Sequence, residues 1–169
     1  VGAGPAGLAF AVKAAECGHD VVLFDASDKI GGQMNIARKV PGKEEFNETI
    51  RYFGNRLEVT GVDVRLSTRV EAEDLEDFDE VVLATGVTPR TPELPGVDHP
   101  KVVGYLDVLR DEVPIGEKVA ILGAGGIGFD VAEYLTDPGT DTRENIPAFL
   151  AEWGVDSEQV APGGLIPPV

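Results

Sequence analysis

Apolar positions along the chain fall into short continuous runs and into longer sets with helical spacing. The short runs at residues 21–24 and 81–83 favour strands buried on both faces of a parallel sheet, and residues 63–66 and 118–122 are predicted as two further strands. The longer sets predict helices over residues 8–17, 44–58, 106–110 and 146–153, and one more that residues 123–128 open and that ends near residue 135. Strands that alternate with helices and glycine turns are typical of a Rossmann-like, doubly wound α/β fold with a parallel sheet.

The first glycine-rich turn lies at the start of the chain, where Gly2, Gly4 and Gly7 have the spacing Gly-x-Gly-x-x-Gly. In this pattern the first glycine permits a tight turn, the second lets the backbone approach a pyrophosphate, and the third lets the helix pack closely on the sheet. The helix N-terminus adds free N–H groups and the positive end of a dipole. Asp25 follows Gly7 by 18 residues, at the end of the next strand, where it can accept hydrogen bonds from a ribose diol. This order of motifs predicts dinucleotide binding.

A second turn of the same spacing is formed by Gly123, Gly125 and Gly128, with Gly126 inside it. It follows a predicted strand and opens a predicted helix. Alone it is compatible with a nucleotide site or with a close-packed structural turn, because the charged residue that should end the next strand is not visible before residue 169. Two such turns, 121 residues apart, favour an enzyme that relays hydride between two cofactors.

Two further motifs make the interpretation more specific. The apolar run 81–83 ends in Ala84, Thr85 and Gly86, small residues that let backbone lie close to a ligand. A Gly31-Gly32-Gln33 turn stands between this run and the first glycine-rich turn. The order of these motifs resembles that of the flavin-dependent pyridine-nucleotide oxidoreductases. The resemblance implies that the first turn binds FAD, that the second binds NAD(P)H, and that the Ala-Thr-Gly strand crosses between them.

A narrower resemblance covers nearly the whole chain. Six stretches are similar to the bacterial NADPH-dependent 2,4-dienoyl-CoA reductases, and they span residues 24–26, 30–37, 41–46, 105–110, 125–130 and 152–156. That family lies in the old-yellow-enzyme-like NADH:flavin oxidoreductase group, whose amine dehydrogenases share several of the motifs. The resemblance implies a modular enzyme, in which a flavin barrel holds FMN and an acyl-CoA substrate. A 4Fe–4S cluster links the barrel to an FAD and NADPH module, and this chain resembles part of that module.

The resemblance also implies roles for individual residues. Gly4, Pro5 and Ala6 would meet the FAD pyrophosphate, and Asp25 the adenosine ribose. Gly32, Gln33 and Lys43 would approach the flavin side, although Lys43 taken alone has the character of a solvated surface lysine. Val70 would touch the adenine through its backbone. Ala84, Thr85 and Gly86 would line the cofactor, and residues 123–128 would meet the NADPH phosphates. Catalytic residues and metal ligands of the family match no position of this chain.

Composition and charge exclude several other classes. The chain has 169 residues, with 30 acidic and 14 basic side chains and a formal net charge of −16, so nucleic acid and anionic membranes are poor partners. One cysteine and two distant histidines give neither a disulfide framework nor a metal-ligand spacing. No apolar run approaches the roughly 18 residues of a membrane span, and no signal peptide is visible. We expect a cytoplasmic protein.

Both ends of the sequence are unusual for a complete domain. Only Val1 precedes the first glycine-rich turn, where a whole strand is expected, and residues 160–169 have loop composition. We therefore expect a fragment, with an FAD-binding domain over 1–112 that lacks its first strand and the start of an inserted NAD(P)H-binding domain over 113–169. In the parent enzyme hydride would pass from NADPH to FAD, and electrons would continue through the cluster to FMN and a 2,4-dienoyl-CoA of fatty acid β-oxidation. The chain by itself is expected not to turn this substrate over.

Two alternatives stay open. The parent enzyme could be another member of the group, of the amine dehydrogenase or enoate reductase type. The chain could instead be a non-catalytic dinucleotide-binding module, which would bind ADP-ribose without a flavin. The Ala-Thr-Gly strand and the Gly-Gly-Gln turn favour an enzyme. The sequence indicates neither the substrate nor the oligomeric state.

Overall fold

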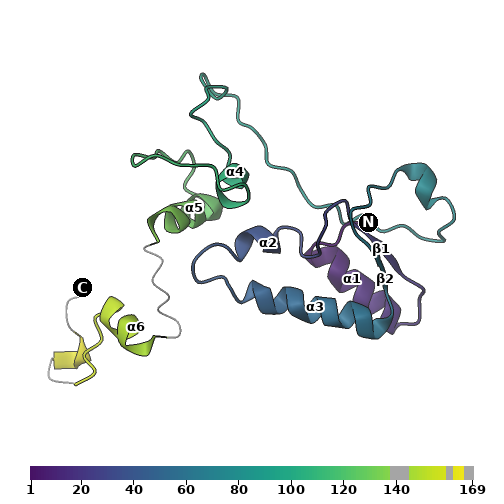
Figure 1. Ribbon diagram of the computed structural model, residues 1–169, viewed down its shortest axis with the longest axis horizontal. Coiled ribbons are helices and arrows are strands. Elements are labelled where there is room, and N and C mark those ends of the chain that lie inside the picture. Colours follow the sequence, from purple (N-terminus) through teal and green to yellow (C-terminus); the bar gives the residue numbers. More distant parts are fainter. Residues whose placement is uncertain (138–144, 159–161, 166–169) are drawn as a thin grey trace. The chain divides into compact units, whose positions relative to one another are not determined.

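The computed structural model describes residues 1–137, 145–158 and 162–165. The chain divides into two compact units, Val1–Leu135 and Thr136–Val169. The first unit contains the elements that surround both glycine-rich turns, and Figure 1 follows them along the chain. The boundary predicted between residues 112 and 113 stays a prediction.

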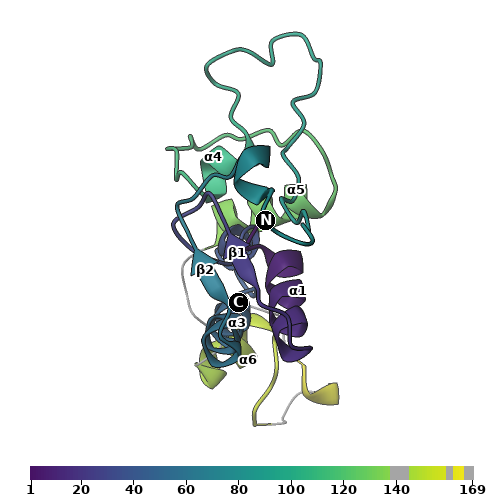
Figure 2. The same ribbon diagram turned by 90° about the vertical axis from the view of Figure 1, so that its right-hand side faces the viewer.

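The first unit begins with a strand–helix arrangement of the predicted kind. Helix α1 spans Pro5–Glu16 and is followed by strand β1, Val22–Phe24. Helix α3, Phe46–Thr60, leads into strand β2, Asp63–Arg65, which pairs in parallel with β1 so that Leu23 lies opposite Val64. The two helices lie side by side next to the strand pair (Figure 1, Figure 2). A parallel pair connected through a helix confirms the Rossmann-like α/β fold.

One apolar core holds this arrangement together. Its buried members come from the first glycine-rich turn, both helices and the strand pair, and they are Ala3, Leu8, Ala11, Val12, Leu23, Met34, Leu57 and Val62. Met34 belongs to the short helix α2, Met34–Ala37, within a segment that the sequence describes mostly as loop. Burial of an aliphatic side chain contributes about 1.5–3 kcal/mol, so this core fixes the helix that follows the first glycine-rich turn.

A second core forms further along the same unit. Helix α4 spans Tyr105–Leu109, and helix α5 spans Gly126–Thr136. Their buried residues Val108, Leu109 and Val131 pack with Val40, which follows α2. Between β2 and α4 lies one turn of 3-10 helix, Ala72–Leu75.

Two predicted strands are wrong for the described structure. Residues 81–83 and 118–122 form no strand, and Leu83 and Leu122 are 72% and 77% exposed. A strand needs a ladder of backbone hydrogen bonds. The first segment has such bonds with one residue, Val1, whose amine donates to the Val82 carbonyl at 2.8 Å and whose carbonyl accepts from the Ala84 N–H at 2.7 Å. This single contact places the segment beside the first turn without continuing the ladder.

The second unit contains helix α6, Ile146–Glu152, as the sequence predicts. The Asn145 side chain caps its N-terminus by accepting from the Ala148 N–H at 3.1 Å. A short 3-10 helix, Pro162–Gly164, and an antiparallel bridge between Val155 and Leu165 follow. The remainder of the loop-like tail lies outside the described residues. Within the described part of the chain, no helix has the length and apolar character needed to cross a bilayer.

Candidate functional site

The first glycine-rich turn has the geometry that its sequence predicts. Gly2 has a φ of +103°, a conformation that favours glycine. A Cβ atom built on Gly7 would lie 1.8 Å from the Gly2 carbonyl oxygen, and one built on Gly2 would lie 2.3 Å from the Ala84 carbonyl oxygen. Only hydrogen fits at these two positions, because the opposing atoms belong to the backbone. The turn therefore depends on Gly2 and Gly7 for its close packing.

Segments that are distant in sequence meet at this turn. The Gly31 N–H donates to the Ala3 carbonyl at 2.8 Å, and a Cβ atom on Gly32 would lie 2.8 Å from the Gly4 Cα. The Gln33 side chain donates from Nε2 to the Val87 carbonyl at 3.3 Å. The structure thus brings together three of the predicted motifs: the first turn, the Gly-Gly-Gln turn and the segment after Ala84. Thr85 and Gly86 lie in that segment and are exposed.

The N-terminus of α1 is open to an anion. Pro5 occupies the first helical turn and has no N–H, no side chain caps the helix, and no acidic residue lies in its first turn. The N–H group of Ala6 therefore meets no side-chain acceptor there. In a chain with 30 acidic side chains, the first turn of the helix itself adds no carboxylate to the positive end of the helix dipole.

Asp25 directly stabilises the turn, a role that its sequence position did not predict. Its Oδ2 accepts from the Ala3 N–H at 2.5 Å, and its Oδ1 accepts from the Ser27 N–H at 2.7 Å. The bond to Ser27, two residues on, has the pattern of an Asx turn, which a sequence can suggest. The bond to Ala3 spans 22 residues and has no local signal.

We expect Asp25→Ala to weaken FAD binding by about ten- to hundredfold, because it removes a charge-assisted hydrogen bond from the turn itself. Titration of the apoprotein with FAD, followed by flavin fluorescence, measures the change. Asp28→Ala is the matched control, since Asp28 is exposed and lies three residues away in the same loop. Equal FAD affinity in the two variants would contradict this role of Asp25.

A hollow opens at the carboxyl end of β1. It has a volume of about 360 Å³, and its lining residues are Phe24, Arg65, Thr68, Arg69, Val70, Asp74 and Phe78. The Phe24 and Phe78 rings meet edge to face with centroids 6.0 Å apart, and the Arg65 guanidinium lies 5.3 Å from the Phe24 centroid. Aromatic rings beside a guanidinium suit a flat heteroaromatic ring. Val70, expected to touch adenine, therefore lines a hollow of suitable chemistry.

The second glycine-rich turn repeats the geometry of the first. Gly123 has a φ of +120°, and a Cβ atom on Gly128 would lie 2.3 Å from the Gly123 carbonyl oxygen. The Phe129 N–H donates to the Gly125 carbonyl at 3.1 Å, as the Leu8 N–H donates to Gly4 at 2.9 Å. Helix α5 begins at Gly126, in the register in which α1 begins at Pro5, and its first turn also lacks an acidic residue.

Lys43 lies in an ion pair. Its Nζ is 2.6 and 2.7 Å from the two carboxylate oxygens of Asp130 in α5. The sequence did not predict this pair, which joins residues 87 positions apart.

The comparisons with known proteins agree with this geometry. The family described as pyridine nucleotide-disulphide oxidoreductase matches residues 1–154. The chain belongs to this family. Because Cys17 is its single cysteine, no redox disulfide forms within the chain of this pyridine nucleotide-disulphide oxidoreductase.

Several larger proteins are similar to this chain. A metal reductase of Desulforamulus reducens is 35% identical over 86% of the chain and 23% of the relative. An NADH oxidase of Thermoanaerobacter brockii is 34% identical over 95% of the chain and 25% of the relative. A solved 2-naphthoyl-CoA reductase complex has a TM-score of 0.75 and 36% identity, over 79% of the chain and 21% of that structure. The chain spans about a quarter of the length of these relatives.

Proposed function

We propose that the first glycine-rich turn binds FAD, that the second binds NAD(P)H, and that the module positions the two for hydride transfer. The matched geometry of the two turns carries this proposal. Each has a first glycine at positive φ, a third glycine beneath the carbonyl of the first, and a helix without acid in its first turn. A single sensor site would need one such turn, whereas a relay needs two.

The residues present fit FAD at the first turn. Gly4 leaves space for a pyrophosphate, because a Cβ atom there would meet nothing nearer than the Gly32 Cα at 3.9 Å. Pro5, Ala6 and Gly7 place the helix N-terminus beneath it. Asp25 holds the turn through Ala3, and its remaining lone pairs are available to a ribose diol. The hollow beside Val70 would receive the adenine.

The rest of the site would hold the flavin and the nicotinamide nucleotide. Gly32 lies against the first turn, and Gln33 contacts the segment that follows Gly86. Gly32 and Gln33, together with Ala84, Thr85 and Gly86, would therefore border the flavin side of FAD. Gly123, Gly125, Gly126 and Gly128 would approach the NAD(P)H phosphates. NAD(P)H held by the second glycine-rich turn would supply hydride, two electrons and one proton together, to the flavin of FAD held by the first turn. The chain contributes orientation and backbone electrostatics to this step.

We further propose that the parent enzyme is an NADPH-dependent 2,4-dienoyl-CoA reductase, with FMN and a 4Fe–4S cluster outside this chain. The six stretches shared with that family support this assignment, and the similarity to a 2-naphthoyl-CoA reductase structure supports an acyl-CoA substrate.

The full-length protein provides the test. Visible absorbance after purification should show bound FAD, and anaerobic addition of NADPH or NADH should bleach it. Colourless protein that binds ADP-ribose would contradict the oxidoreductase function and favour the non-catalytic module. If flavin reduction is observed, turnover of a 2,4-dienoyl-CoA should follow, while turnover of a secondary amine or a free enoate in its place would assign the parent enzyme to those types. Turnover of a dienoyl-CoA by the 169-residue chain alone would contradict its expected role as a partial module.

A further inference from the structure

Helix α5 packs against the part of the first unit that is proposed to bind FAD. The face of α5 that makes this contact differs from the face that α1 buries. The motif places α5 in register with α1, so Val131 corresponds to Phe10 and Phe129 corresponds to Leu8. In α1, Leu8 is fully buried and Phe10 is 51% exposed. In α5 the exposures are reversed, with Phe129 68% exposed and Val131 buried at 7%. Val131 is therefore buried by a contact that has no counterpart at the corresponding position of α1.

The partner of that face is the segment around α2. Val131 packs in one cluster with Val40, which is 1% exposed, and Ile36 from α2 borders the same cluster. Lys43 follows Val40 by three residues, and its ammonium pairs with Asp130, the neighbour of Val131. An apolar contact and an ion pair thus join the same two segments at adjacent positions.

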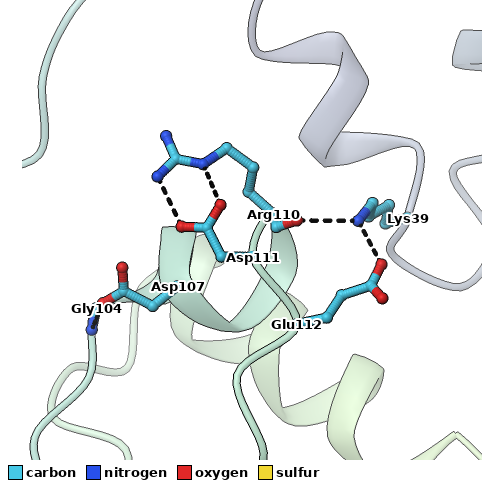
Figure 3. A network of polar contacts seen from close by, with 6 residues as sticks. All are labelled: Lys39, Gly104, Asp107, Arg110, Asp111 and Glu112. Carbon is cyan, nitrogen blue, oxygen red and sulfur yellow. Dashed lines mark hydrogen bonds and ion pairs between the residues drawn. The ribbon is translucent and has the colours of Figure 1, made fainter.

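A second lysine of this segment contacts the end of α4. Lys39 Nζ lies 2.8 Å from the Glu112 carboxylate and 3.4 Å from the Arg110 carbonyl oxygen, as Figure 3 shows. The hydrogen bond from Lys39 lowers the pKa of Glu112. The contact is therefore fully present at pH values above the ordinary pKa of a glutamate, and it is lost as the pH falls through the lowered pKa. In the same view Arg110 pairs with Asp111 at 2.7 Å, and Asp107 accepts from the Gly104 N–H at 2.7 Å.

The Lys43–Asp130 pair is better placed to restrain helix α5 than the Lys39–Glu112 pair is to restrain α4. The side chains of Lys43 and Asp130 are 38% and 27% exposed, whereas that of Glu112 is 67% exposed. Both Asp130 oxygens contact the ammonium, which fixes the pair more closely than a single contact. Asp130 lies in the second turn of α5, four residues after Gly126, where the helix begins. A restraint at this point controls the direction of the helix N-terminus.

We infer that Lys43 and Asp130 are positioning residues, which hold the N-terminus of α5 at a fixed distance from the first glycine-rich turn. This inference rests on the proposed function, because the second turn must carry NAD(P)H for the distance to matter. Lys43 then acts through Asp130 on the alignment of the nicotinamide nucleotide with FAD, rather than by touching the flavin. Small errors in such alignment reduce hydride transfer while leaving binding at each turn intact.

The test is anaerobic stopped-flow reduction of the flavin in the full-length protein at several NADPH concentrations. For Lys43→Met we expect the limiting rate to fall by about tenfold, with FAD content and the Kd for NADPH unchanged. Lys43→Asp and Asp130→Lys should each lower the rate at least as much, and the double variant should recover most of it. Arg56→Met is the matched control, because the Arg56–Glu16 pair has similar exposure, at 32% and 35%, and joins α3 to α1.

The outcomes distinguish a positioning role of Lys43 from a direct flavin contact and from failure of the proposed function. An unchanged limiting rate in Lys43→Met, or a double variant no faster than the single ones, would overturn the positioning role. Loss of FAD from Lys43→Met, with FAD retained in Asp130→Asn, would overturn it in favour of a direct flavin contact. Failure of the proposed function has a different signature, since the unsubstituted protein would then contain no flavin or would not be reduced by NADPH.

Discussion

Gly7→Ala is expected to produce protein without bound FAD and with a free energy of unfolding lower by about 4 kcal/mol. The added methyl carbon would lie 1.8 Å from the Gly2 carbonyl oxygen, and no rotamer change can relieve this clash because the backbone fixes the positions of both atoms. Helix α1 must therefore shift away from the turn, which disrupts its packing through Leu8 in the first core. Chemical denaturation and the flavin content of the purified protein measure the two effects.

Gly54→Ala is the matched control for this prediction. Gly54 also lies in a helix, α3, and a Cβ atom there would make an ordinary contact with Ile30 at 3.7 Å. Alanine at such a position is expected to be neutral or to stabilise by up to about 1 kcal/mol. A Gly7→Ala protein that retains both FAD and the stability of the Gly54→Ala protein would refute the assigned role of the first turn.

Gly128→Ala is expected to separate the two cofactor sites. The methyl carbon would lie 2.3 Å from the Gly123 carbonyl oxygen and would distort the second turn, while the first turn is unchanged. We expect FAD to remain bound and to be reducible by dithionite, with reduction by NADPH at least about a hundredfold slower. Anaerobic stopped-flow absorbance distinguishes these two reductants in one preparation.

Gly116→Ala is the corresponding control, because a Cβ atom on Gly116 meets no atom within 4 Å. Should Gly128→Ala lose FAD, the second turn would be contributing to the flavin site. Should it keep a normal rate with NADPH, the nicotinamide nucleotide must bind elsewhere.

Local sequence signals predicted the elements around the first core well. Helices over 8–17 and 44–58 correspond to Pro5–Glu16 and Phe46–Thr60, and the strands predicted over 21–24 and 63–66 correspond to β1 and β2. Helical spacing and glycine stops depend on residues that are close in sequence, so they can be recognised in a single sequence. Helix α2, with four residues, is too short for such periodicity to detect.

Long-range contacts account for what the sequence could not predict. The run 81–83 has the composition of a buried strand, but strand formation depends on a pairing partner, and its described backbone partner is Val1. The sequence predicts Asp25 as an acceptor for the ribose, which stays a prediction, whereas its bond to Ala3 depends on how β1 returns to the first turn. Lys43 and Asp130 each have the character of a surface residue, and the second core brings them together.

The hydrogen bonds of Val1 also determine when the first site can form during folding. The backbone of Val82 and Ala84 completes the turn at Gly2, and the bond between Val1 and Val82 joins residues 81 positions apart. Contacts of such large sequence separation form slowly, because the entropy of a long loop must be lost before the contact stabilises anything. The local unit of α1 and β1 can assemble early, but a site competent for FAD must await the arrival of the segment around Ala84. Binding of FAD at the proposed site would therefore be a late event in the folding of this module.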